Sequence, residues 1–148
     1  MAMQSQDPIK SYLFKLEIEG DQLMGLFTEC SGIGSETEVI EHKVVQNGKP
    51  VIMKVPGRLK WENITLKKGI TDDMKVWNWR HQIEIGQVEG NRFNGSIIMT
   101  DHDLTPVARW DFERGWPTKV SGPSPKADSN EIGIEEIVLA HEGILRVS

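Results

Sequence analysis

This sequence of 148 residues lacks the features of disulfide-stabilised, membrane-spanning and disordered chains. Its one cysteine, Cys30, excludes an internal disulfide framework and a cysteine-rich zinc site. Its apolar runs are only a few residues long, too short to cross a bilayer. The polar residues 1–10 contain no hydrophobic stretch, so no signal peptide is visible and we expect folding in a cytoplasm. Hydrophobic residues make up 38% of the chain, which is too apolar for disorder.

The length suits one domain spanning residues 1–148, with residues 1–10 as a flexible N-terminal arm. Charge is unevenly placed along it. Residues 1–42 carry 2 basic and 8 acidic side chains, residues 43–80 carry 9 and 3, and residues 81–148 carry 6 and 11. A basic middle is compatible with nucleic-acid binding, with an evenly mixed folded surface, or with self-association of a basic face and an acidic one.

Alternating polarity predicts a mainly β chain. Residues 12–19 place Tyr12, Phe14, Leu16 and Ile18 on one side, which is typical of a half-buried strand. Similar patterns predict strands at residues 23–28, 61–67, 96–100, 107–113 and 131–145. In the last of these the apolar parity switches at Glu135-Glu136, which predicts a β-bulge there.

Residues 38–55 form a predicted β-hairpin around Asn47-Gly48, a pair that accepts the positive φ angles of a tight turn. We expect Pro56-Gly57 to end it. Its arms alternate poorly, so neither side is expected to be fully buried against its own domain. An exposed two-stranded ribbon is marginal alone and needs a partner, which can be another chain.

One helix is predicted over residues 72–85, capped by Thr71 or Asp72 and stopped by Gly86. Met74, Trp77, His81 and Ile85 fall near one of its faces, and Val76, Trp79 and Ile83 widen the apolar stripe, so His81 is expected in the core. With about seven strands, the fold class is mainly β, a small barrel or sandwich.

No catalytic constellation is found. Ser31-Gly32-Ile33-Gly34-Ser35 lacks the lysine and following helix of a phosphate loop, and Gly-x-Ser-x-Gly is absent. Cys30 has no basic neighbour in sequence to make it a thiolate. Asp101-His102-Asp103 is the most tempting metal or catalytic cluster, but a turn before Pro106 explains it equally well. We therefore expect no catalytic residue, metal or cofactor. The five tryptophans could stack on sugars, although packing is favoured.

Several ordered segments carry a family resemblance. They are residues 27–33, residues 55–69, the Trp77-Asn78-Trp79 helix, residues 116–119, Gly122-Pro123, residues 130–136 and residues 139–143. Together they resemble the inner tube proteins of contractile injection systems, which include the tail tube proteins of contractile-tailed phages and of phage-derived extracellular injection particles.

The resemblance implies a β-barrel of about six strands with one flanking helix and a long protruding hairpin. Six copies would form a ring, and stacked rings would form a tube that conducts DNA or protein cargo. Sheath, baseplate and terminator proteins are the implied partners, without direct membrane binding by the subunit. The implied location is the bacterial cytoplasm, then a virion tail or injection particle. The hairpin at residues 38–55 would contact neighbouring subunits through Val39, Ile40, Lys43, Val44, Val51, Met53, Lys54 and Val55.

Two other functions stay open on the sequence. One is a monomeric β-barrel module that binds a small ligand or a sugar through Trp61, Trp110 or Trp116. The other is an enzyme that uses Asp101, His102 or Asp103. In the tube hypothesis, the basic block from Lys43 to Arg80 meets acidic blocks of another copy.

Overall fold

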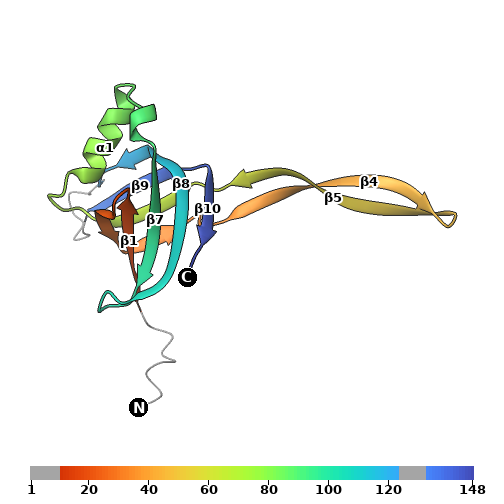
Figure 1. Ribbon diagram of the computed structural model, residues 1–148, viewed down its shortest axis with the longest axis horizontal. Helices are drawn as coiled ribbons and strands as arrows, with labels where there is room; N and C mark the ends of the chain where they lie inside the picture. Colours follow the sequence, from red (N-terminus) through yellow and green to blue (C-terminus); the bar gives the residue numbers. More distant parts are fainter. Residues whose placement is uncertain (1–10, 124–132) are drawn as a thin grey trace, which may run out of the picture.

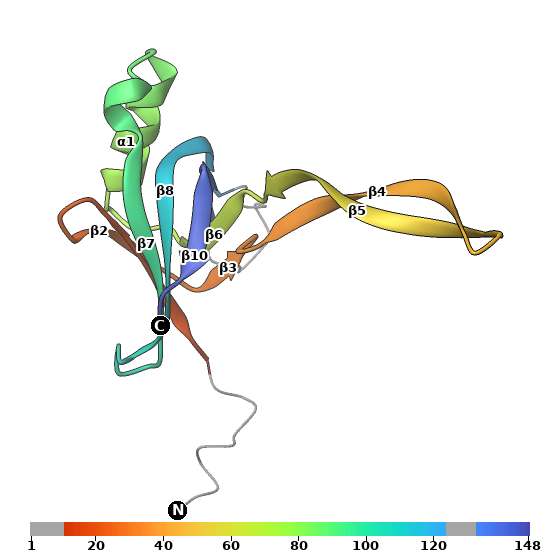
Figure 2. The same cartoon turned by 45° about the vertical axis from the view of Figure 1, so that its right-hand side comes forward.

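A computed structural model describes residues 11–123 and 133–148 as a mainly β structure with one α-helix (Figure 1). The predicted arm at residues 1–10 and the start of the last predicted strand region, Glu131 and Ile132, lie outside the described residues. A long two-stranded hairpin projects from the body, and a second view shows the same projection (Figure 2). In the described residues, no helix is of a length and hydrophobicity that would span a membrane.

The body is an eight-stranded antiparallel sheet. Its strands are β1 (Leu13–Ile18), β2 (Gln22–Phe27), β3 (Glu29–Ser31), β6 (Ile64–Gly69), β7 (Phe93–Thr100), β8 (Pro106–Ser121), β9 (Ile134–Ala140) and β10 (Gly143–Arg146). Their order is β2-β1-β7-β8-β9-β6-β3, and β10 pairs with β8. With the two hairpin strands, the described residues form ten strands rather than the seven or so predicted.

The sheet curls strongly but does not close. Its end strands, β2 and β3, are consecutive in the chain and are separated only by Thr28. The Thr28 N–H donates a hydrogen bond of 2.8 Å to the Lys67 carbonyl, which joins this crossing point to β6. The chain can pass from one end of the sheet to the other in one residue only because the sheet bends round. In the described part of the chain, no pairing completes the predicted closed barrel.

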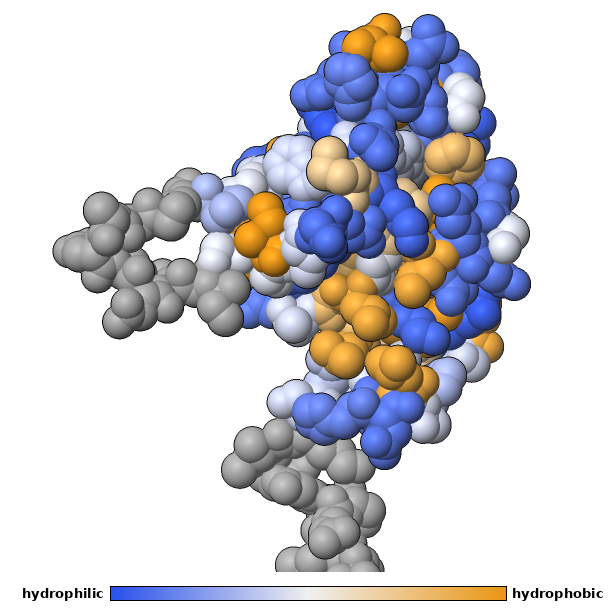
Figure 3. Space-filling view, turned by 90° about the vertical axis from the view of Figure 1, so that its left-hand side faces the viewer, coloured by the Kyte–Doolittle hydropathy of each residue, from blue (hydrophilic) through white to orange (hydrophobic). Residues whose placement is uncertain are grey.

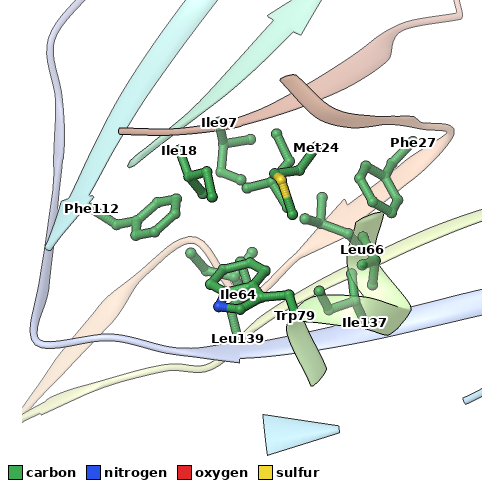
Figure 4. Close-up of a cluster of buried hydrophobic side chains, with 12 residues drawn as sticks. Ile18, Met24, Phe27, Ile64, Leu66, Trp79, Ile97, Phe112, Ile137 and Leu139 are labelled. Carbon is green, nitrogen blue, oxygen red and sulfur yellow. The ribbon is translucent and has the colours of Figure 1, made fainter. Parts of the chain in front are cut away.

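The core lies inside this curl. Its twelve buried side chains are Leu16, Ile18, Met24, Phe27, Ile64, Leu66, Val76, Trp79, Ile97, Phe112, Ile137 and Leu139. Trp79 reaches from the helix among side chains that come from the strands (Figure 4). Phe112 lies close over Gly95 and Gly115, where an added Cβ would come within 2.6 Å and 2.4 Å of its ring. Both glycines therefore make room for the aromatic ring.

The helix α1 (Lys75–Glu84) is shorter than the predicted 72–85 and packs by only one part of the predicted apolar stripe. Thr71 and Asp73 accept hydrogen bonds from the backbone N–H groups of Asp73 and Lys75 in the turn before it. The buried residues are Val76, Trp79 and Ile83. His81 is exposed beside Glu84, so the expectation of a core histidine is wrong. A short 3₁₀ turn, η2 (Glu89–Asn91), follows, and the Asn91 carbonyl accepts the Trp79 indole N–H at 2.8 Å.

The predicted bulge at Glu135-Glu136 is also wrong. β9 pairs with β6 without a register shift, from Ile64↔Leu139 to Gly69↔Ile134. Glu135 is buried in phase with Ile137 and Leu139, whereas Ile134 is exposed. A charged side chain therefore occupies an inward position that the sequence pattern assigns to the outside.

Candidate assembly interface

The hairpin is built from two strands that, among the described residues, pair only with each other. They are β4 (Ser35–Gln46) and β5 (Lys49–Trp61), which extend the hairpin beyond the predicted residues 38–55 at both ends. Asn47 and Gly48 have φ values of 52° and 77°, as the two-residue turn between them requires. Nearly every residue of β4 and β5 is exposed, because the hairpin stands clear of the body (Figure 1).

Pro56-Gly57 does not end the hairpin as predicted. Pro56 pairs with Val39, and the pairing resumes at Leu59 with Thr37. Between these pairs Gly57 and Arg58 stand opposite the single residue Glu38, which is a β-bulge in β5. Proline is tolerated in a strand whose outer edge is free, and a bulge absorbs the irregularity. β5 therefore continues to Trp61.

The register sorts the hairpin side chains onto two faces, since directly paired residues point the same way. We call the first the apolar face; it consists of Ile40, His42, Val44, Val51, Met53 and Val55. We call the second the mixed face; it consists of Val39, Glu41, Lys43, Val45, Pro50, Ile52, Lys54 and Pro56. The poor alternation seen in sequence comes from valines and isoleucines that occupy the mixed face as well.

The structure divides the eight predicted interface residues between these faces. Five belong to the apolar face, and Val39, Lys43 and Lys54 belong to the mixed face. Sequence reasoning missed Val45, Ile52 and Leu59, which are 74%, 54% and 51% exposed. The signal was present in the runs Val44-Val45 and Val51-Ile52-Met53, where apolar residues occupy both parities.

The root of the hairpin is tied to the body by short contacts. The Glu62 N–H donates to the Gly34 carbonyl at 3.2 Å, which joins the two strands where they enter the sheet. His141 follows β9, and its Nε2 lies 2.9 Å from the Glu62 carbonyl. The Trp61 ring lies 6.0 Å from the His141 ring. The hairpin therefore leaves the body from a fixed base.

On the side of the body away from the hairpin, apolar side chains gather in a patch bordered by hydrophilic ones (Figure 3). Elsewhere on the body, acidic residues line a hollow of about 340 Å³, together with Arg109. There the pKa of Asp111 is lowered, first by the hydrogen bond from Ser96 and then by the Arg109 guanidinium. The body thus carries both an apolar patch and a hollow lined by acidic residues.

The predicted chemistry candidates do not form a reactive site. Asp101 Oδ1 accepts hydrogen bonds of 2.9 Å from the backbone N–H groups of Asp103 and Thr105, which makes this cluster a turn before β8. Burial raises the pKa of the Cys30 thiol to about 12, so it is protonated at neutral pH. Residues 11–123 and 133–148 hold no group of three or more side chains that could bind a metal ion.

The five tryptophans contact groups of their own chain. Trp77 and Trp79 donate hydrogen bonds from their indoles to Glu135 and Asn91. The rings of Trp110 and Trp116 lie under the guanidinium groups of Arg146 and Arg92, at 5.7 Å and 5.8 Å. These contacts, with that of Trp61 to His141, match the packing role that the sequence favoured over sugar stacking.

The described residues thus form a curved antiparallel sheet that carries a hairpin paired with none of their other strands. The comparisons with known proteins agree. The sequence pattern of the T4-like virus tail tube protein gp19 family matches residues 10–145, and the chain belongs to this family. It is a tail tube subunit of a phage tail or contractile injection system, a structural protein and not an enzyme. The resemblance to inner tube proteins is thereby confirmed.

Solved structures show the same relationship. A chain of the PVC sheath-tube complex, from an extracellular contractile injection system in the extended state, is 26% identical, with a TM-score of 0.75 over 95% of this chain and 90% of that one. A chain of the anti-feeding prophage tube-terminating cap is 27% identical, with a TM-score of 0.74 over 100% and 99%. Hcp1 from Flavobacterium johnsoniae, at 13% identity and a TM-score of 0.54 over 90% and 94%, shares the fold. No curated protein sequence matches this chain.

Proposed function

We propose that copies of this chain assemble into hexameric rings, and that the rings stack into an inner tube through which DNA or protein cargo passes. The observation that carries this proposal is the hairpin, whose apolar residues have no partner within the described residues. Only head-to-tail contacts between unlike surfaces can close a ring and also extend a stack. A hairpin on one side of the body and apolar surface on the other meet that requirement (Figures 1 and 3).

The contacts between copies would use Val39, Ile40, Lys43, Val44, Val51, Met53, Lys54 and Val55 of the hairpin. Burying a few hundred Å² of this surface contributes several kcal/mol at about 25 cal/mol per Å² before the costs of association. Repetition round a ring and along a stack then holds a tube together although each contact is modest.

The partners and location follow from the relatives. Their structures are described as a sheath-tube complex, a sheath/tube terminator, a tube-terminating cap and a baseplate. By similarity, this chain would contact a sheath, a baseplate and a terminator protein, without binding a membrane directly. It would be made in the bacterial cytoplasm and become part of a virion tail or injection particle.

The test compares the purified full chain with a shortened-hairpin variant by electron microscopy and sedimentation. The variant lacks residues 42–53 but keeps Glu41 and Lys54, which are paired, joined by an Asn-Gly turn. We expect rings or tubes from the full chain, and from the variant a monomer that is lighter than one full chain of 16.7 kDa. Circular dichroism should show that the body of the variant is unchanged, because no body strand pairs with β4 or β5. A full chain that stays monomeric at high concentration and in sheath-containing particles would refute the proposal.

A further inference from the structure

Two Asn-Gly dipeptides occur in this chain, and the structure places them in opposite surroundings. Asn47-Gly48 forms the turn at the tip of the hairpin, and both residues are exposed. Asn94-Gly95 lies in β7, which pairs with β1 on one side and β8 on the other. Asparagine before glycine is open to attack by the backbone nitrogen that follows it, because glycine has no side chain to block the approach. The two dipeptides therefore form a matched comparison within one molecule.

The tip of the hairpin leaves the reacting atoms free to meet. Nothing lies within 4 Å of a Cβ added at Gly48, so the space around this glycine is open. The pair Gln46↔Lys49 closes the turn, and the Gly48 N–H stands outside that pairing. Among the described strands β4 and β5 pair only with each other, and the end of such a ribbon opens at little cost. Opening lets Asn47 rotate about its Cα–C bond, which brings its Cγ to the Gly48 nitrogen.

Asn94-Gly95 is held on both sides. The Arg114 backbone N–H donates a hydrogen bond of 3.0 Å to Asn94 Oδ1. A Cβ added at Gly95 would lie 2.4 Å from the Glu17 carbonyl oxygen and 2.6 Å from the Phe112 ring, so this glycine is closely covered. The same reaction here requires β7 to separate from its neighbours, which costs a much larger part of the free energy of unfolding.

We propose that Asn47 is a site of spontaneous covalent modification, at which the unassembled chain converts asparagine to aspartate or isoaspartate. The Gly48 nitrogen gives its proton to water and bonds to Asn47 Cγ, and the side-chain amide leaves as ammonia. The product is a cyclic imide, which water then opens. Cleavage between Cγ and the nitrogen gives aspartate, whereas cleavage between the backbone carbonyl carbon and the nitrogen gives isoaspartate. Water is the co-reactant, and nothing is oxidised or reduced.

Both products place a carboxylate at the tip of the hairpin. β4, β5 and their turn carry 3 acidic and 5 basic side chains, a net charge of +2, so the modified hairpin carries +1. Aspartate keeps the turn, because Asp-Gly suits it as Asn-Gly does. Isoaspartate inserts a methylene group into the backbone of a connection that has only two residues between Gln46 and Lys49. The modification therefore changes the charge of the hairpin in every case and the shape of its turn in one.

The experiment incubates the chain, diluted until sedimentation shows a monomer, in mildly alkaline buffer made with heavy-oxygen water. Peptide mass spectrometry follows Asn47 and Asn94 over time. Asn47→Gln is the control at the tip, because glutamine keeps the carboxamide but closes a larger ring far more slowly. A second sample in guanidinium chloride removes the fold and leaves the two dipeptides in like surroundings. Circular dichroism shows that the unchanged chain and the variant are folded in buffer.

We expect the folded chain to lose ammonia at Asn47 at least about tenfold faster than at Asn94, because opening costs little at a hairpin tip and approaches the global free energy in a central strand. Each product should gain one labelled oxygen, and the two rates should be similar in guanidinium chloride. Asn47→Gln should give almost no product at this position. A folded chain in which Asn47 reacts no faster than Asn94 would overturn the inference, as would equal product from Asn47→Gln. Neither result bears on the tube function, which the assembly experiment tests separately.

Discussion

Lys68 and Glu135 face each other across β6 and β9, with the Lys68 Nζ 3.7 Å from Glu135 Oε2 and both side chains buried. The Trp77 indole N–H of α1 donates to the other carboxylate oxygen of Glu135. Lys68 Nζ also lies 5.2 Å from the centre of the Phe27 ring. This buried pair thus joins the helix, β9, β6 and β2 at one point.

We predict that Glu135→Gln destabilises the fold by about 3–5 kcal/mol, because it leaves the Lys68 ammonium buried without a counter-charge. The glutamine can still accept the Trp77 hydrogen bond, so the change isolates the ion pair. Urea unfolding measures the free energy. The double variant Lys68→Met/Glu135→Gln removes both charges and should recover most of the loss. Equal stability of Glu135→Gln and the unchanged chain would contradict this role.

Gly95→Ala is expected to destabilise the sheet by about 1–3 kcal/mol, the usual cost of overpacking. The added methyl group would lie 2.4 Å from the Glu17 carbonyl oxygen and 2.6 Å from the Phe112 ring. Gly90→Ala is the matched control, because nothing lies within 4 Å of a Cβ added there. Thermal unfolding should separate the two variants clearly. A melting temperature for Gly95→Ala equal to that of Gly90→Ala would show that the ring can move aside.

Cys30 should react slowly with thiol reagents in the folded chain at pH 8, and rapidly in urea. Burial raises its pKa from 9.0 to about 12, so at pH 8 the unfolded thiol supplies a small reactive thiolate fraction and the folded thiol almost none. Well below pH 9 the thiol is almost fully protonated in both states, and this group leaves stability nearly unaffected. As the pH rises from 9 towards 12, the unfolded state loses the proton first and stability falls. Cys30→Ala should show a smaller alkaline loss of stability than the unchanged chain.

Assembly should weaken as salt rises, because the hairpin is positively charged and the remainder negatively charged. Exposed charges are screened over about 10 Å at 0.1 M salt and about 3 Å at 1 M. Light scattering between about 0.05 and about 1 M sodium chloride measures how assembly depends on salt. Lys43→Gln/Lys54→Gln, which removes two charges from the mixed face, should reduce the salt dependence. Assembly that strengthens steadily with salt would mean that apolar burial alone drives it.

The sequence was informative where the cause is local. Asn47-Gly48 located the turn of the hairpin, and alternation located β1. The sequence pattern predicted that the hairpin is not fully buried against its own domain, and its two faces follow from the pairs that run without a shift from Gln46↔Lys49 to Val39↔Pro56. The bulge at Gly57 and Arg58 changes the register only at the base of the hairpin, and the sequence pattern did not reveal it.

The sequence-based predictions that proved wrong concern residues whose contacts lie far away in the chain. Glu135 appears to break the parity of β9 in sequence, yet Lys68 and Trp77 stabilise it inside. The helix α1 buries the part of its predicted apolar stripe that Val76, Trp79 and Ile83 form, with the Trp79 indole N–H bound to the Asn91 carbonyl, and it leaves His81 exposed. Closure of the sheet depends on how β2 passes into β3, and local patterns do not specify it.

Both ends of the hairpin enter the body side by side, β4 just after β3 and β5 just before β6. A force on the tip would therefore pull β3 and β6 in the same direction along their axes. β6 is held to β9 by six consecutive register pairs, from Ile64 to Gly69. Such a load would stretch these bonds together as shear instead of opening them one by one.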